Sequence, residues 1–120
     1  MGRLIVIGGG AAGMMAAAVA GAGGIETVLI EKNEKLGKKV YITGKGRCNL
    51  TNDCDVRDFL KNVVSNEKFL YSALYGFSPQ ATIDYFESIG LKTKIERGNR
   101  VFPVSDHSSD VNKYLEKAIK

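Results

Sequence analysis

A glycine-rich segment near the N-terminus carries the clearest chemical pattern in the chain. Residues 8–13 read GGGAAG, which satisfies the pattern G-x-G-x-x-G. Gly8 permits a tight turn, Gly10 lets a pyrophosphate approach the backbone, and Gly13 lets a helix and a strand pack closely. A helix that begins here directs unpaired N–H groups and a partial positive charge at phosphates. We therefore predict cofactor contacts from Gly8, Gly10, Ala12 and Gly13.

The residues around this loop predict the elements that position it. Arg3–Ile7 is a β-branched run typical of a buried strand, and Glu26–Glu31 is a second apolar strand. Between them, the Ala-rich residues Ala11–Ala22 predict a helix that Gly23 and Gly24 end. Strand, glycine turn, helix and strand within about 30 residues form a βαβ unit with a right-handed crossover.

An acidic residue stands where a dinucleotide site needs one. Glu31 ends the second predicted strand, 18 residues after Gly13. Its carboxylate can accept hydrogen bonds from an adenosine ribose, and its charge disfavours a 2′-phosphate there. The next residue, Lys32, can pack over an adenine or stay solvated. The loop and this carboxylate together predict a site for an ADP-containing cofactor.

The remaining sequence makes the expected fold class α/β, with a Rossmann-like βαβ unit followed by helices and a β-hairpin. A short strand is expected at Val40–Thr43 within an irregular basic stretch. Ser78 and Pro79 begin one of the later helices, and Ser108 or Ser109 caps the last one. The expected elements are helical segments with apolar faces over 56–64, 69–77, 79–90 and 109–119, and hairpin strands at Thr93–Glu96 and Val101–Val104.

Composition and charge narrow the classes of partner. The chain has 120 residues, of which 44% are hydrophobic and 25% charged, as in one ordinary globular domain. Residues 1–50 hold 7 Lys and Arg against 3 Asp and Glu, whereas residues 51–120 hold 10 of each kind. Tyr41 is the only aromatic residue in the basic run Lys32–Arg47, so a bound polyphosphate explains the local charge as well as nucleic acid does. We expect no nucleic-acid partner; a solvated basic loop is the alternative.

The N-terminal stretch is not expected to enter a membrane. Between Arg3 and Glu26 lie 22 uncharged residues, enough to span a bilayer, but 14 of them are Gly or Ala and a glycine cluster interrupts them. The same interruption argues against a secretory signal, although residues 18–20 (AVA) imitate a cleavage site. Two cysteines agree with a reducing compartment. We expect a cytoplasmic protein without a membrane partner.

Residues 4–32 resemble the N-terminal motif of flavoproteins with two dinucleotide-binding domains, whose ligand is FAD. Residues 36–39 (LGKK), 43–52 (TGKGRCNLTN) and 98–103 (GNRVFP) resemble the BaiN-like, or aminoacetone-oxidase-like, FAD-dependent oxidoreductases. The resemblance runs over nearly the whole chain. In that family the loop matching Gly44–Asn49 lies along the FAD. The resemblance thus implies cofactor contacts from Gly44, Gly46, Arg47, Cys48 and Asn49, with Lys45 where many members have glycine.

The residue types in this loop agree with that role. Gly44 and Gly46 leave backbone N–H groups accessible, Arg47 offers a fork of donors, and Asn49 can donate and accept. Lys39, with its neighbour Lys38, can neutralise phosphate charge or remain a surface lysine.

The sequence offers no clear catalytic residue. Cys48 and Cys54 are not spaced as C-x-x-C, so we interpret Cys48 as a structural thiol beside the cofactor rather than a redox group, and expect no metal site. His107, the only histidine, precedes a helix start and is interpreted as a surface or capping residue.

The resemblance implies hydride transfer between FAD and a small organic substrate, with NAD(P)H as electron donor in the full-length protein. A module that binds NAD or ADP without redox chemistry is the alternative. We expect residues 1–120 to be the N-terminal part of an FAD-binding domain, truncated before a third parallel strand and without a complete second domain. Such a fragment is expected to be inactive alone and to self-associate through its unpaired apolar strand edge.

Overall fold

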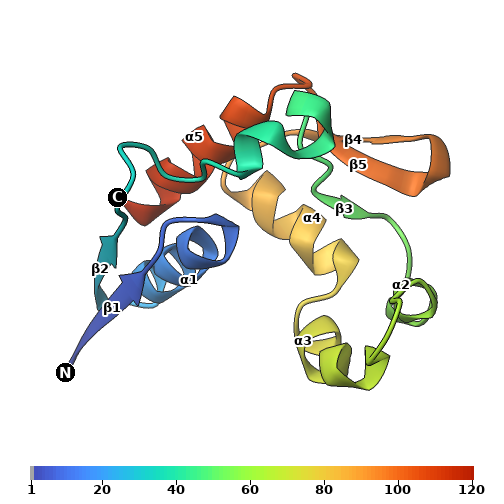
Figure 1. Ribbon diagram of the computed structural model, residues 1–120, viewed down its shortest axis with the longest axis horizontal. Helices are drawn as coiled ribbons and strands as arrows, with labels where there is room; N and C mark the ends of the chain where they lie inside the picture. The colour runs from blue at the N-terminus through green and yellow to red at the C-terminus, as the bar shows by residue number, and fades with distance from the viewer. Residues whose placement is uncertain (1) are drawn as a thin grey trace. The chain divides into compact units, whose positions relative to one another are not determined.

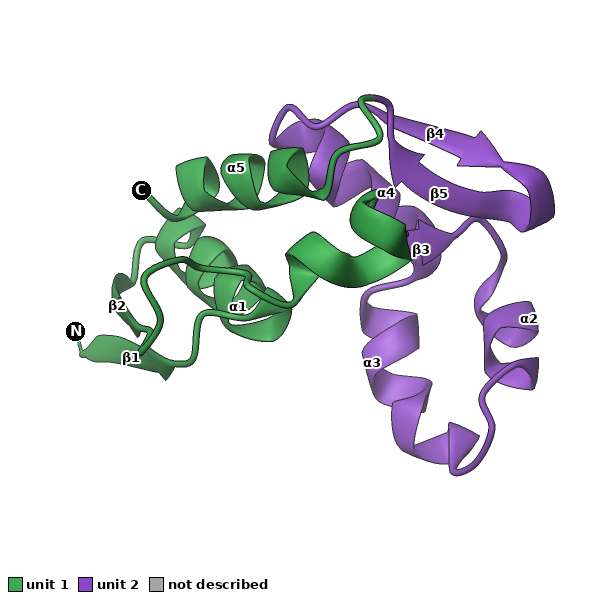
Figure 2. Cartoon of the chain, turned by 45° about the horizontal axis from the view of Figure 1, so that its top comes forward, with its two compact units in different colours: residues 1–48, 105–120 green, residues 49–104 purple. Residues whose placement is uncertain are grey.

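The computed structural model describes residues 2–120, which form two compact units (Figures 1 and 2). Unit 1 consists of the residues up to Cys48 together with Ser105–Lys120, and unit 2 consists of Asn49–Val104. The chain therefore leaves unit 1, builds unit 2 and returns to complete unit 1.

Unit 1 contains the βαβ unit expected from the sequence. Strands β1 (Arg3–Ile7) and β2 (Glu26–Ile30) pair in parallel, in a register that runs from Arg3 opposite Glu26 to Ile7 opposite Ile30. Helix α1 (Ala11–Ala22) connects them and contacts both strands (Figure 1). The unit is completed by the 3₁₀ segment η1 (Val40–Gly46) and helix α5 (Ser108–Ile119). The mixed α/β class and the Rossmann-like unit are confirmed.

The core of unit 1 lies around α1 and α5, which contact each other. Met14, Ala17 and Ala18 are buried on α1, and Val111 and Leu115 are buried on α5. The small alanine side chains let the two helices approach closely, while Met14, which is fully buried, fills the larger gap.

The strands of unit 1 are less buried than their sequence predicts. Val6 and Leu29 lie on the face that α1 covers, whereas Ile7 on the other face is 84% exposed and Ile30 is 51% exposed. A parallel sheet normally carries helices on both faces, which is why its strands read as continuous apolar runs. In residues 2–120 the β1–β2 sheet has two strands and α1 covers one face, so the expectation of fully buried strands is wrong for the other face.

Unit 2 combines short helices with a small antiparallel sheet of strand order β3-β5-β4. The expected hairpin is confirmed, with Gly98 and Asn99 adopting positive φ at its turn. Buried side chains include those of Phe86, Leu91 and Val101. The elements are β3 (Thr51–Asn52), α2 (Val56–Lys61), η2 (Glu67–Leu70), α3 (Tyr71–Gly76), α4 (Pro79–Ser88), β4 (Thr93–Glu96), η3 (Arg97–Asn99) and β5 (Arg100–Pro103).

Helix boundaries were predicted well where a local cap defines them. The hydroxyl of Ser78 accepts a hydrogen bond from the N–H of Ala81 at 3.1 Å, and Pro79 is the first helical residue of α4, as expected. At α5 the expectation was wrong. His107 occupies the N-cap without a side-chain cap, and Ser108 is the first helical residue.

Three other segments differ from their predicted form. The strand expected at Val40–Thr43 is instead the start of η1, because successive backbone bonds curl the chain rather than pair it with a neighbour. Helix α2 ends at Lys61, so the apolar spacing does not continue as helix to Val64. The segment expected as one helix from Phe69 is divided between η2 and α3, and Phe69 is 84% exposed.

Within residues 2–120, no helix has both the length and the apolar character needed to cross a membrane.

Candidate functional site: a dinucleotide-binding loop

The glycine loop lies between β1 and α1, as the sequence predicts. Gly10 is the N-cap of α1 and, having no side chain, provides no cap to the N–H groups of the first helical turn. The N–H of Gly8 donates to the carbonyl of Ile30 at 2.7 Å, which ties the start of the loop to the end of β2. The open first turn of a 12-residue helix is thus held beside the carboxyl ends of both strands, where open α/β sheets bind ligands.

The three glycines of the pattern meet different constraints. Gly8 has φ +103°, a conformation that disfavours any side chain. Gly13 allows close packing, since a Cβ there would collide with the carbonyl oxygen of Gly8. A Cβ on Gly10 would meet nothing within 4 Å, and the φ of this residue, −79°, suits any amino acid. The fold therefore requires glycine at positions 8 and 13, whereas open space at Gly10 leaves room for a phosphate to contact the backbone.

The carboxylate of Glu31 is hydrogen-bonded to this loop. Its two oxygens accept from the N–H groups of Gly9 and Asn33, each at 2.7 Å. These bonds, that from Asn33 first and that from Gly9 second, hold the pKa of Glu31 below its usual value of 4.5. A carboxylate has about four lone-pair sites, so these two bonds leave acceptor capacity for a ribose.

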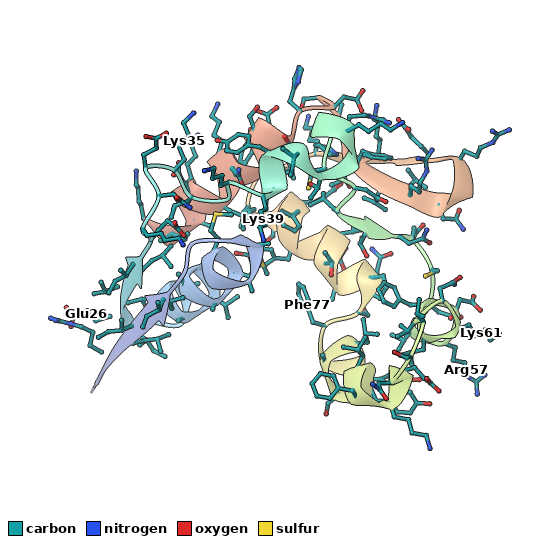
Figure 3. The ribbon with its side chains drawn as sticks, in the orientation of Figure 1. Glu26, Lys35, Lys39, Arg57, Lys61 and Phe77 are labelled. Atoms are coloured by element: carbon teal, nitrogen blue, oxygen red, sulfur yellow. The ribbon has the colours of Figure 1, made fainter. Side chains whose placement is uncertain are left out.

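The segment that follows β2 and Glu31 is rich in lysine. A hollow of about 300 Å³ is lined by Lys32, Asn33, Glu34, Lys35 and Lys38. The ammonium of Lys35 lies 5.8 Å from the ring centre of Tyr41. Lys39, labelled with Lys35 in Figure 3, is exposed just before η1. Lys32 and Lys38 share this hollow, while Lys39 is not among its lining residues.

The loop of Gly44–Cys48 has a left-handed backbone at several positions. Gly44, Lys45 and Gly46 have φ values of +55°, +56° and +85°, and Cys48 has +61°. Lys45 therefore occupies a conformation that glycine adopts more readily. The loop places accessible backbone at Gly44 and half-buried backbone at Gly46.

The side chains at the end of this loop have partners within the chain. The Nε and Nη2 atoms of Arg47 donate to Oδ1 of Asp106 at 2.9 and 2.7 Å. Cys48 is buried, and this burial raises the pKa of its thiol, with the Thr43 side chain partly offsetting the effect. Asn49 belongs to unit 2, where its amide donates to the carbonyls of Thr51 and Val101 at 2.9 and 3.1 Å.

Three polar residues of this region were not identified from the sequence as hydrogen-bonding partners of the site, although Ser108 was expected as a helix cap. Asp106 binds Arg47 from a left-handed position, and nothing local marks it as a partner. Ser108 and Asn112 are buried and hydrogen-bonded to carbonyls of Tyr41 and Gly37. The signal for this pair was present, because both residues interrupt the apolar face of the last helix at a spacing of one turn.

The other candidates do not form a second centre. His107 is exposed, and residues 2–120 contain no group of three His, Cys, Asp or Glu side chains that could hold a metal ion. A larger hollow of about 620 Å³ in unit 2 contains none of the predicted site residues; its lining includes Arg57 and Lys61 of α2, labelled in Figure 3.

These features define a Rossmann nucleotide-binding module: a parallel βαβ unit, a helix N-terminus without a side-chain cap at a glycine turn, and a carboxylate at the end of β2. Comparison with known proteins identifies its kind. Residues 2–120 match the family described as HI0933-like protein Rossmann domain, and the chain belongs to this family. The resemblance noted from the sequence is thus confirmed, and the module is of the type found in flavin-type oxidoreductases.

Two curated relatives are similar to this chain. The 3-dehydro-bile acid delta(4,6)-reductase of Clostridium scindens is 37% identical over 122 residues, covering 100% of this chain and 29% of the relative. The ribosomal RNA dihydrouridine synthase of Escherichia coli is 39% identical over 88 residues, covering 72% of this chain and 21% of the relative. The chain spans less than a third of the length of either protein.

The glycine geometry predicts a contrast in stability. Gly13→Ala should destabilise the protein by about 1–3 kcal/mol, because the added methyl group must push α1 away from Gly8. Gly10→Ala, at an N-cap with open space, should cost less than about 1 kcal/mol. Urea unfolding measures both values, and equal losses would contradict the different constraints assigned to the two glycines.

The hydrogen bonds to Glu31 predict a pH dependence. Because the folded pKa lies below the unfolded value of about 4.5, the charged carboxylate stabilises the fold fully above that pH. The contribution is lost as the pH falls through the folded pKa. The difference in melting temperature between wild type and Glu31→Gln should be constant near neutrality and shrink below about pH 4.5. A difference that widens toward acid pH would contradict this sign.

Proposed function

We propose that this chain supplies the FAD-binding part of a flavin-dependent oxidoreductase, in which a hydride passes between the flavin and a small organic substrate. The observation that carries the proposal is Gly10. This glycine is not required by the fold, yet it stands at the open N-terminus of α1 with free space beside its Cα. A pyrophosphate that approaches the backbone accounts for a glycine at this position.

The residues of unit 1 fit the adenosine and phosphate parts of FAD. The first-turn N–H groups, including that of Ala12, would bind the pyrophosphate, and Glu31 would accept from the ribose while its charge disfavours a 2′-phosphate. Lys32 and Lys39 would lie near the adenine and the phosphates. Bound FAD supplies reversible hydride chemistry, and the protein supplies binding and orientation.

The segment from Gly44 to Asn49 is assigned to the flavin side of the cofactor. The assignment rests on the family pattern, on the backbone N–H groups of Gly44 and Gly46 and on the guanidinium of Arg47. Asn49, whose amide nitrogen donates to Thr51 and Val101, would contribute its side-chain oxygen as an acceptor. Cys48 has a structural role in this proposal, because a buried thiol with a raised pKa is a poor nucleophile at neutral pH.

In the protein that contains these residues, NAD(P)H would supply the reducing equivalents. We propose that this protein acts in the cytoplasm. The two relatives are named for a bile acid and for ribosomal RNA. Because these substrates differ so widely, the proposal for this protein stops at the reaction class.

The deciding experiment compares the N-cap glycine of α1 with a glycine inside the helix. Gly10→Val should lower FAD affinity by more than about tenfold, because the branched side chain blocks the pyrophosphate. Gly21→Val is the matched control, since Gly21 lies in the same helix and a Cβ there also meets nothing within 4 Å. Equilibrium dialysis with FAD and thermal unfolding provide the measurements, with each variant made in the whole protein that contains these residues.

The outcomes separate the proposal from its alternative. Unchanged FAD binding by Gly10→Val, or binding of NAD or ADP in preference to FAD by the wild type, would contradict it. Glu31→Ala should weaken FAD binding by roughly tenfold, the effect of a lost hydrogen bond to a charged acceptor.

We also propose that the isolated 120-residue chain self-associates. Ile5, Ile7, Val28 and Ile30 lie on the sheet face opposite α1 and are all exposed. Exposed apolar strands with unpaired edges recruit other strands or apolar surfaces. The 120-residue chain, which spans less than a third of either relative, should accordingly hold FAD poorly and show no turnover.

Sedimentation velocity tests this association. The double variant Ile7→Thr, Ile30→Thr should shift the chain toward monomer, whereas Val64→Thr, a fully exposed position in unit 2, should not. A wild-type chain that sediments as a compact monomer with stoichiometric FAD would contradict both parts of this proposal.

A further inference from the structure

Helix α5 buries two polar side chains in an otherwise apolar face. Ser108 is 4% exposed and Asn112 is 2% exposed, and the buried residues beside them are Val111 and Leu115. Burying a hydroxyl and an amide costs free energy unless both find partners. The hydrogen-bond partners of these two side chains therefore identify the segment that this face of α5 holds in place.

Both side chains donate to the same short backbone segment of unit 1. The hydroxyl of Ser108 donates to the carbonyl of Tyr41 at 2.8 Å, and the amide of Asn112 donates to the carbonyl of Gly37 at 3.0 Å. Donors and acceptors are each four residues apart, so one turn of α5 matches residues 37–41. We call this pair of side chains the polar clamp.

Gly37 links the polar clamp to the dinucleotide loop. Its N–H donates to the carbonyl of Gly9 at 2.6 Å, and the N–H of Gly9 in turn donates to Glu31 at 2.7 Å. A continuous series of hydrogen bonds thus runs from Asn112 through Gly37 and Gly9 to Glu31. Gly9 lies between the turn residue Gly8 and the N-cap Gly10, so its orientation fixes the direction of the loop.

The environment of Gly37 leaves little freedom in this link. Gly37 is buried with φ +66°, and a Cβ there would collide with the amide of Asn112. The Oδ1 atom of Asn112 has no hydrogen-bond partner among the described residues. Since an unpaired buried acceptor is unfavourable, an apolar side chain of similar size would serve stability at least as well. The contribution of Asn112 is therefore its donor to Gly37.

We propose that Ser108 and Asn112 are positioning residues for the cofactor. By holding residues 37–41, the polar clamp sets the carbonyl of Gly9 and keeps the N–H groups around Gly10 directed at the pyrophosphate. This proposal rests on the proposed FAD function for its ligand, but the hydrogen-bond series itself can be tested without any ligand.

The test separates positioning from simple stabilisation. Asn112→Leu should leave the melting temperature nearly unchanged, because the carbonyl of Gly37 also accepts from the N–H of Tyr41 at 3.4 Å. It should weaken FAD binding by about five- to tenfold, the effect of one lost hydrogen bond. Amide exchange of Gly9 and Gly37, measured by NMR on the ligand-free chain, should become faster. Ser108→Ala should show the same pattern to a smaller degree.

Two variants of the same helix act as controls. Lys113→Ala, at an exposed position, should change nothing, and Leu115→Ala should lower the melting temperature without weakening FAD binding where the protein is folded. The proposal would be overturned if Asn112→Leu had the same FAD affinity and the same glycine exchange rates as Lys113→Ala. It would also be overturned if Leu115→Ala weakened FAD binding as much as Asn112→Leu does. If the whole protein that contains these residues binds no FAD, the proposed function is refuted instead. Faster exchange in Asn112→Leu would then still support the clamp.

Discussion

The close approach of α1 to the turn after β1 is the constraint on which the nucleotide loop depends. Gly13 faces the carbonyl oxygen of Gly8 with no space for even a methyl group between them. This contact brings the N-terminus of α1 to the carboxyl ends of the strands, where its N–H groups can act on a ligand. Gly10 keeps the space in front of those groups clear, and Glu31 fixes Gly9 from the side of β2.

Helix α5 packs against α1 and also stabilises this arrangement. Val111 and Leu115 bury apolar surface, and Ser108 and Asn112 direct hydrogen bonds at the segment that contacts Gly9. The same face of α5 thus stabilises unit 1 and orients the glycine loop. The sheet, in contrast, presents Ile7 and Ile30 without cover in residues 2–120, so its outer face contributes little to the stability of unit 1.

Local patterns were sufficient to predict β1, α1, β2 and the hairpin, because glycine, proline and alternating apolar residues act over a few positions. Spacing alone also placed Glu31 after the second strand, while its contact with a ribose stays a prediction. The sequence did not indicate that η1 replaces a strand, because its backbone bonds depend on how residues 37–41 meet α5. The sequence overestimated side-chain burial at Ile7 and Phe69, because burial there would need another element packed over the side chain. The partners of Arg47, Ser108 and Asn112 lie 59 or more residues away, beyond the reach of periodicity.

Unit 1 is discontinuous in sequence, since unit 2 is inserted between Cys48 and Ser105. The ion pair of Arg47 and Asp106, at 2.7 Å, joins the chain just before the insertion to the chain just after it. During synthesis the glycine loop is made before the helix that orients it, because the whole of unit 2 lies between the two segments in the sequence. Closing so long a loop carries an entropic cost that local contacts avoid. The nucleotide loop is therefore synthesised before α5 but becomes rigid only when α5 has packed beside it.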